Sequence, residues 1–109
     1  MMPANVPRQL RTTEAQFQTW VTRTARQAGW MVYHTKLSWG STKGFPDLVL
    51  LRAGRLIFAE LKSDHGCASP EQERWLAELR ATGAEVYLWR PAQVEDVFRC
   101  LTARIGVTS

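Results

Sequence analysis

The sequence contains little cysteine and no long apolar run. Cys67 and Cys100 are the only cysteines in 109 residues, too few for a disulfide framework or a zinc site. The longest strongly apolar run, residues 48–51, is far too short to cross a bilayer, and the N-terminal residues lack the apolar stretch of a signal peptide. We therefore expect a soluble intracellular protein with reduced thiols and no membrane partner.

Repeats, linkers and low-complexity segments are also missing from residues 12–101. With 12.4 kDa and 45% hydrophobic residues, the chain can bury one core but has no room for a second. We expect a single domain over residues 12–101, with a flexible arm at 1–11 and a C-terminal tail at 102–109.

Negative charge is in the minority. The chain has ten acidic and fourteen basic residues, which gives a net charge of +4. Eleven of the basic residues are arginine, whose planar guanidinium can bind two phosphate oxygens at once. This balance favours a polyanionic partner, although charge alone supports nucleic acid only weakly.

The hydrophobic pattern alternates between helical and strand periods. It predicts helices over residues 13–28, 69–82 and 91–101, and strands over residues 30–36, 47–52, 55–62 and 85–90. Thr13 with Gln16 and Ser69 with Gln72 have the spacing of capping boxes. Three strands in a meander and a fourth that returns through a helix predict an α/β fold, a mixed four-stranded sheet flanked by helices.

A two-residue turn at Ala53-Gly54 would bring two carboxylates together. If Arg52 faces Arg55, the antiparallel register places Asp47 opposite Glu60. Like charges at such a spacing, about 4.5–5.5 Å between Cβ atoms, repel each other. Lys62 shares the face of Glu60, because strand side chains alternate. Two carboxylates, a backbone carbonyl and waters form the oxygen site that Mg²⁺ prefers, so we expect a divalent cation there.

Two further polar residues point to the same place. Glu14 lies three residues before Phe17, on the predicted buried stripe of its helix, where an unpaired carboxylate is unfavourable. Gln72 shares a helix face with Trp75 and is expected to turn toward the sheet. The alternatives are a solvated acid beside the helix dipole for Glu14 and a purely capping role for Gln72, since both roles would compete for its amide.

The loop before Asp47 is a candidate phosphate-contacting or base-stacking segment. It combines an aromatic ring, hydroxyls and a cation in Trp39, Ser41, Thr42 and Lys43. A plain connection between strands is an equally good interpretation. His34 and His65 are not assigned to catalysis, because structural or surface roles are more common for such histidines.

These motifs together resemble the VRR-Nuc family of the PD-(D/E)xK nuclease superfamily. The matching residues are Gly44-Phe45-Pro46-Asp47-Leu48-Val49, Phe58-Ala59-Glu60-Leu61-Lys62, Ser69-Pro70-Glu71-Gln72, Trp75, Leu79, Gly83 and Val86. The resemblance spans about residues 13–90 and implies a restriction-endonuclease-like αβββαβ core, to which this chain adds a C-terminal helix. Leu61 stands where other members often carry valine, a conservative difference.

The resemblance implies a metal-dependent phosphodiesterase. Asp47, Glu60 and the Leu61 carbonyl would bind Mg²⁺ or Mn²⁺, and Lys62 would position the attacking water. Glu14 would be a further ligand, direct or through water, and Gln72 would support the site. A bound divalent ion supplies the charge stabilisation and the activated water that phosphodiester hydrolysis needs. No organic cofactor is expected, and one metal or two remains open.

Single-domain members of this family look like Holliday-junction resolvases, so the resemblance implies branched DNA as substrate, met in the cytoplasm, at the nucleoid or in a phage-infected host. A homodimer would place two active sites against two strands. The alternatives are a flap or nicking nuclease, a restriction-type enzyme, and a nuclease fold kept only for nucleic-acid binding. The intact set of Asp47, Glu60 and Lys62 argues against the last.

Overall fold

The computed structural model describes residues 12–35 and 42–103. Its elements, in chain order, are α1 (Glu14–Gln27), β1 (Met31–His34), β2 (Leu48–Arg52), β3 (Arg55–Leu61), α2 (Pro70–Ala81), β4 (Glu85–Trp89), the 3-10 turn η2 (Pro91–Gln93) and α3 (Val94–Thr102). The predicted arm, most of the predicted tail, and Trp39 and Ser41 lie outside the described residues. None of the described helices is long and apolar enough to cross a membrane.

Both predicted capping boxes are confirmed. The Thr13 hydroxyl accepts from the Gln16 backbone N–H at 3.0 Å, and the Gln16 side chain accepts from the Thr13 N–H at 3.0 Å. Ser69 and Gln72 exchange the corresponding bonds at 3.1 and 2.8 Å. Because these bonds satisfy N–H groups that have no partner within the helix, they determine where α1 and α2 begin.

The last predicted helix begins differently from expectation. The chain forms the 3-10 turn η2 at Pro91, and α3 starts only at Val94. The Gln93 N–H donates to the Arg90 carbonyl at 2.8 Å, an i to i+3 bond that tightens the first turn. Such turns are common at helix ends.

The sheet has the predicted mixed topology. Its strand order is β1-β2-β3-β4, with β1–β2 and β2–β3 antiparallel and β3–β4 parallel. Arg52 pairs with Arg55 across the hairpin, as predicted, and Leu48 pairs with Ala59. The turn residues Ala53 and Gly54 both have positive φ, 49° and 81°, the conformation that suits a two-residue hairpin. The paired residues end at Leu48 and Ala59, and Asp47 and Glu60 are the next residues along the two chain segments.

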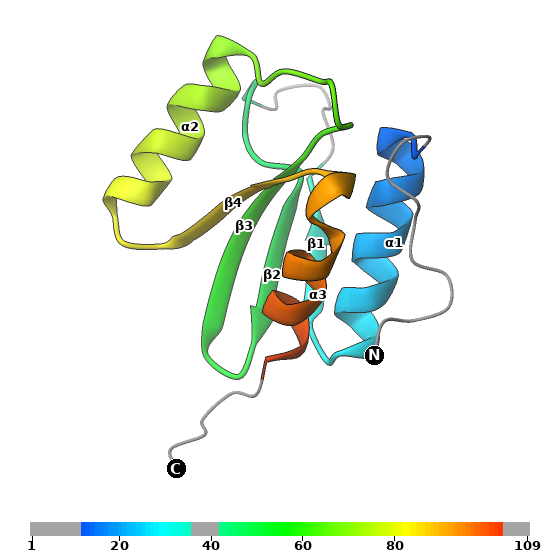
Figure 1. The fold of residues 1–109 in the computed structure, drawn as a ribbon. Coiled ribbons are helices and arrows are strands. Elements are labelled where there is room, and N and C mark those ends of the chain that lie inside the picture. Colours follow the sequence, from blue (N-terminus) through cyan, green and yellow to red (C-terminus); the bar gives the residue numbers. More distant parts are fainter. Residues whose placement is uncertain (1–11, 36–41, 104–109) are drawn as a thin grey trace.

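Helices cover both faces of the sheet. α1 and α3 lie together on one face (Figure 1) and enclose the main core with Leu48, Leu50 and Ile57 from the strands. Side chains at alternate positions point to the other face, where Phe45 contacts the rings of Phe58 and Trp75 at centroid distances of 5.9 and 5.2 Å. α2 therefore packs on the face that also carries Glu60.

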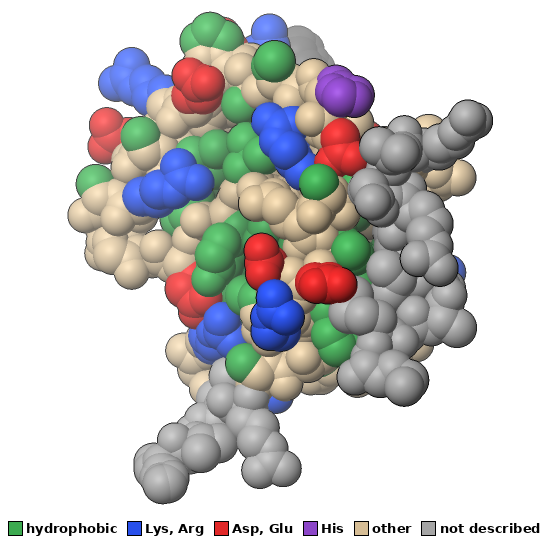
Figure 2. All heavy atoms as spheres, viewed as in Figure 1, with side chains coloured by type: hydrophobic (Ala, Val, Ile, Leu, Met, Phe, Trp, Pro, Cys, Tyr) green, Lys and Arg blue, Asp and Glu red, His purple; other side chains and the backbone are tan. Residues whose placement is uncertain are grey.

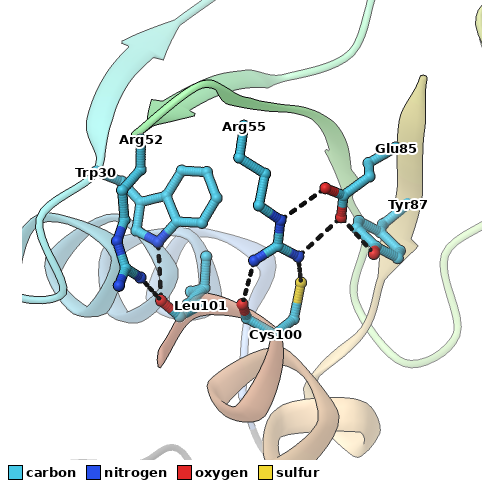
Figure 3. A network of polar contacts seen from close by, with 7 residues as sticks. All are labelled: Trp30, Arg52, Arg55, Glu85, Tyr87, Cys100 and Leu101. Carbon is cyan, nitrogen blue, oxygen red and sulfur yellow. Dashed lines mark hydrogen bonds and ion pairs between the residues drawn. The ribbon is translucent and has the colours of Figure 1, made fainter. Parts of the chain in front are cut away.

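A polar network ties the β2–β3 hairpin to α3 at the opposite end of the sheet (Figure 3). The guanidinium carbons of Arg52 and Arg55 lie 5.7 and 5.3 Å from the Trp30 ring centroid. The Trp30 indole and Arg52 both donate to the Leu101 carbonyl, at 2.8 and 2.9 Å. Arg55 also forms a two-pronged ion pair with Glu85, at 2.6 and 2.8 Å. Cations near the last carbonyls of α3 complement its helix dipole.

Part of the α2 face stays uncovered. Met31, Leu51 and Leu56 lie side by side across β1, β2 and β3, and they are 72%, 45% and 39% exposed. Tyr33, the next residue of β1 on this face, is 66% exposed. Contiguous exposed apolar side chains of this kind are typical of interaction surfaces.

Candidate active site

The β2–β3 register brings Asp47 and Glu60 together. Asp47 directly precedes β2, and its Oδ2 accepts a hydrogen bond from the Leu61 N–H at 2.8 Å. This bond holds the Asp47 carboxylate against β3. Glu60 is 1% exposed, a rare degree of burial for a carboxylate. The pairing geometry predicted from the two-residue turn is thus present in the fold.

Glu60 has partners on one carboxylate oxygen and none on the other. Oε2 accepts from Gln72 Nε2 at 2.8 Å and lies 3.3 Å from Lys62 Nζ. Oε1 is buried without a hydrogen-bond partner among the described residues. Burial raises the pKa of Glu60 from 4.5 to about 7, and the Asp47 charge adds to the rise, while Lys62 opposes it. When Glu60 is ionised, its Oε1 atom therefore carries negative charge without a hydrogen-bond donor among the described residues.

Gln72 fulfils both roles that the sequence analysis treated as competing. Its Oε1 accepts the Ser69 N–H at 2.8 Å, which completes the cap of α2. Its Nε2 donates to Glu60 Oε2. A side-chain amide has separate acceptor and donor ends, so one does not exclude the other. The start of α2 and the position of the Glu60 carboxylate are therefore coupled through one side chain.

Glu14 is exposed, and the prediction that it lies on the buried stripe of α1 is wrong. It is the first residue of the helix, and side chains in a first turn point back toward the N-terminus, past the layer in which Phe17 is buried. Its charge still contributes to the raised pKa of Glu60, after burial and the Asp47 charge. Within residues 12–35 and 42–103, no three His, Cys, Asp or Glu side chains converge as a metal site.

The residues present fit a divalent cation with few protein ligands. The two carboxylates and the Leu61 carbonyl offer oxygen atoms, and Glu60 Oε1 is buried without a hydrogen-bond partner among the described residues. Mg²⁺ is bound through one or two carboxylates and retains several waters, so a third acidic ligand is not required. Oxygen donors of this kind are compatible with Mg²⁺ or Mn²⁺.

Arg90 is a residue of the site region that the sequence analysis missed. Its guanidinium donates to the carbonyls of Ser63 and Gly66 at 2.7 and 2.6 Å. These carbonyls belong to the loop that follows Lys62, whose own N–H donates to the Trp89 carbonyl at 3.0 Å. Arg90 therefore anchors the chain just beyond Lys62. The arginine at the end of the predicted strand 85–90 was the available signal.

The remaining candidate residues of the described parts form no hydrogen bond or ion pair with Asp47 or Glu60. Thr42 and Lys43 are exposed, and Lys43 borders a cavity of about 270 Å³ beside α2. Gly44 has φ 95°, and a Cβ there would lie 2.7 Å from the Glu71 backbone, so glycine lets this loop pack against α2. His34 contacts Gln18, and His65 is exposed.

Charge on the molecular surface is mixed where Figure 2 shows it. Lys and Arg side chains alternate with Asp and Glu across this face, and hydrophobic side chains lie between them. The net charge of +4 is therefore not gathered into one patch on this side. Charge alone does not identify this face as a DNA-binding surface.

Comparison with known proteins is consistent with this geometry. The family model of the VRR-NUC domain matches residues 9–93. A solved structure of a VRR-NUC domain superposes with a TM-score of 0.68 at 28% identity, covering 81% of this chain and 96% of the other. A VRR-NUC domain protein at 21% identity shares the fold, with a TM-score of 0.66 and coverage of 82% and 84%. Among curated proteins, none matches significantly.

Proposed function

Because the chain belongs to the VRR-NUC domain family, and is thus a nuclease-fold domain, we propose that it is a metal-dependent DNA endonuclease. The observation that carries this proposal is the arrangement around Glu60. Asp47 lies across the hairpin, Lys62 Nζ is 3.3 Å from Oε2, and Oε1 is buried without a partner among the described residues. Two neighbouring carboxylates that share the single ammonium group of Lys62 are only partly compensated, which would destabilise a purely structural protein.

Each residue has a distinct task in this proposal. Asp47, Glu60 and the Leu61 carbonyl would hold Mg²⁺ or Mn²⁺, with Glu14 contributing through water. When bound, the ion stabilises negative charge on the phosphate and lowers the pKa of water. Lys62, whose side chain is 13% exposed, orients the attacking water through its ammonium group. Gln72 keeps the Glu60 carboxylate in place.

Branched DNA cut by a homodimer is the specific form of the proposal. A second copy would bury Met31, Tyr33, Leu51 and Leu56, which form one exposed apolar surface on the α2 face of the sheet. A two-fold dimer then presents two active sites, one for each of two strands. The proposed reaction uses no organic cofactor.

Cleavage assays on defined DNA structures test the function. The purified protein is incubated with four-way junction, flap, single-stranded and duplex DNA, with EDTA, Mg²⁺ or Mn²⁺. We expect metal-dependent cleavage with a preference for the junction. Fixed cuts in linear duplex would indicate a restriction-type enzyme, and a preference for flaps a flap nuclease. Binding without cleavage under all conditions would leave a nucleic-acid-binding module and refute the proposal.

Substitutions test the residues. Asp47→Asn and Lys62→Ala should abolish cleavage while DNA binding persists, because each removes a group proposed to act on the metal or on the water. The control is Glu95→Gln, which neutralises an exposed acid of α3. If Asp47→Asn cleaves as fast as the Glu95→Gln control, the assignment of the site is wrong.

A further inference from the structure

A cavity lined by polar side chains lies between α1 and β1. Its volume is about 470 Å³, and it is lined by one face of α1, including Thr22, Arg23 and Arg26, and by His34 of β1. His34 pairs with Leu48 in the sheet, so its side chain lies on the α1 face, whereas Asp47 points to the α2 face. The cavity and the candidate active site therefore lie on opposite sides of β1 and β2.

The cavity is positively charged. Arg23 and Arg26 are both exposed on the lining face, and none of the lining residues is acidic. All ten acidic residues of the chain fall within its described parts, and neither arginine is in an ion pair with any of them. Two uncompensated guanidinium groups on one helix face attract an anion, and phosphate matches their fork geometry.

Two buried polar atoms of the lining residues also lack partners. The Gln18 amide nitrogen contacts His34 Nε2. Nδ1 of His34 and Oγ1 of Thr22 are buried without a hydrogen-bond partner among the described residues. Buried polar atoms of this kind usually have a hydrogen-bond partner, and a ligand with several oxygens would accept a hydrogen bond from the Thr22 hydroxyl.

We propose that this cavity binds a phosphate group of the DNA backbone, as a second contact of the substrate away from the cleaved bond. His34 is the last residue of β1, and the next residue, Thr35, donates its N–H to the Asp47 carbonyl at 2.8 Å. Because β1 is the edge strand, DNA that passes Asp47 can continue around this edge toward Arg26. DNA as the source of the phosphate rests on the proposed function, but the anion-binding chemistry does not.

Arg26→Gln tests the charge, with Arg80→Gln as a matched control. Both arginines are exposed, and each lies in the last turn of a helix, α1 or α2. Binding of a single-stranded and a duplex oligonucleotide is measured by fluorescence anisotropy in EDTA at several salt concentrations. We expect Arg26→Gln to weaken binding about three- to tenfold and to lower the salt slope by about 0.7 for single strands and 0.9 for duplex, with little change in Arg80→Gln. Equal effects of the two substitutions would overturn the proposal.

Thr22→Val tests the cavity itself. Valine has nearly the same shape and removes the unpartnered hydroxyl, so the urea midpoint should stay equal or rise while DNA affinity falls. If Arg26→Gln weakens DNA binding and Thr22→Val does not, DNA contacts only the surface arginine and the cavity proposal is wrong. If inorganic phosphate binds tightly while Arg26→Gln leaves DNA affinity unchanged, the cavity serves a free anion and the proposal also fails.

The outcomes separate this proposal from the proposed function. A protein that cleaves no DNA but loses affinity in Arg26→Gln and Thr22→Val retains the cavity site without nuclease activity. A protein that cleaves DNA, is inactivated by Asp47→Asn and binds DNA equally well in both arginine variants is a nuclease without the second phosphate site.

Discussion

Replacing Glu60 with glutamine should stabilise the metal-free protein while it abolishes metal binding. The pKa of Glu60 rises from 4.5 to about 7 in the folded state, chiefly because the carboxylate is buried. One pKa unit corresponds to about 1.36 kcal/mol, so ionising this group above pH 7 lowers the free energy of unfolding by about 3 kcal/mol. Glutamine keeps an acceptor for Gln72 but loses the ion pair with Lys62, so we expect a net gain of about 1–3 kcal/mol.

The gain should depend on pH in a defined direction. Below pH 4.5 Glu60 is protonated in both the folded and the unfolded state, and wild type and variant should differ little. Between pH 4.5 and about 7 the unfolded chain has lost this proton while the folded protein retains it. Wild-type stability therefore falls as pH rises through this window, and the advantage of Glu60→Gln should grow until about pH 8.

Urea unfolding in EDTA at pH 4.5 and pH 8 measures this difference, with Glu95→Gln as an exposed control that should change stability by no more than about 0.5 kcal/mol. Mg²⁺ at tenfold excess over its Kd should then stabilise the wild type by about 1.4 kcal/mol and leave Glu60→Gln unchanged. A variant that is less stable than wild type at pH 8, or whose advantage is the same at both pH values, would refute the reasoning.

Three further variants follow from the contacts described above. Gln72→Leu removes both the α2 cap bond and the bond to Glu60, and should lower the free energy of unfolding by about 1–3 kcal/mol in urea titrations; an unchanged midpoint would contradict the double role. Arg90→Ala frees the loop after β3, and should reduce both stability and the single-turnover cleavage rate at saturating DNA, whereas loss of stability with an unchanged rate would limit this arginine to folding. Met31→Ser with Leu51→Ser should convert a dimer to a monomer in size-exclusion chromatography with light scattering, and a monomeric wild type would exclude the proposed interface.

Much of the fold was predictable because the signals are local. A cap joins residues three apart, so the Thr13 and Ser69 boxes could be read directly from the chain. The two-residue turn at Ala53-Gly54 fixes the register from Arg52 with Arg55 to Leu48 with Ala59. One further step of this register predicts Asp47 opposite Glu60 without any knowledge of the rest of the fold. The central pair of the candidate site was therefore accessible from a single hairpin.

The sequence by itself determined the order of the elements, the starts of α1 and α2, and the pairing of β2 with β3, the strands next to Asp47 and Glu60. Each of these features depends on residues that are close together in the chain. Only the tertiary structure decided that Glu14 is exposed, that Gln72 reaches Glu60, that Arg90 anchors the loop after β3, and that α1 and His34 line an open basic cavity. These contacts join different elements and depend on how each helix sits on the sheet. Local periodicity gives the face of a helix but not its position against its neighbours.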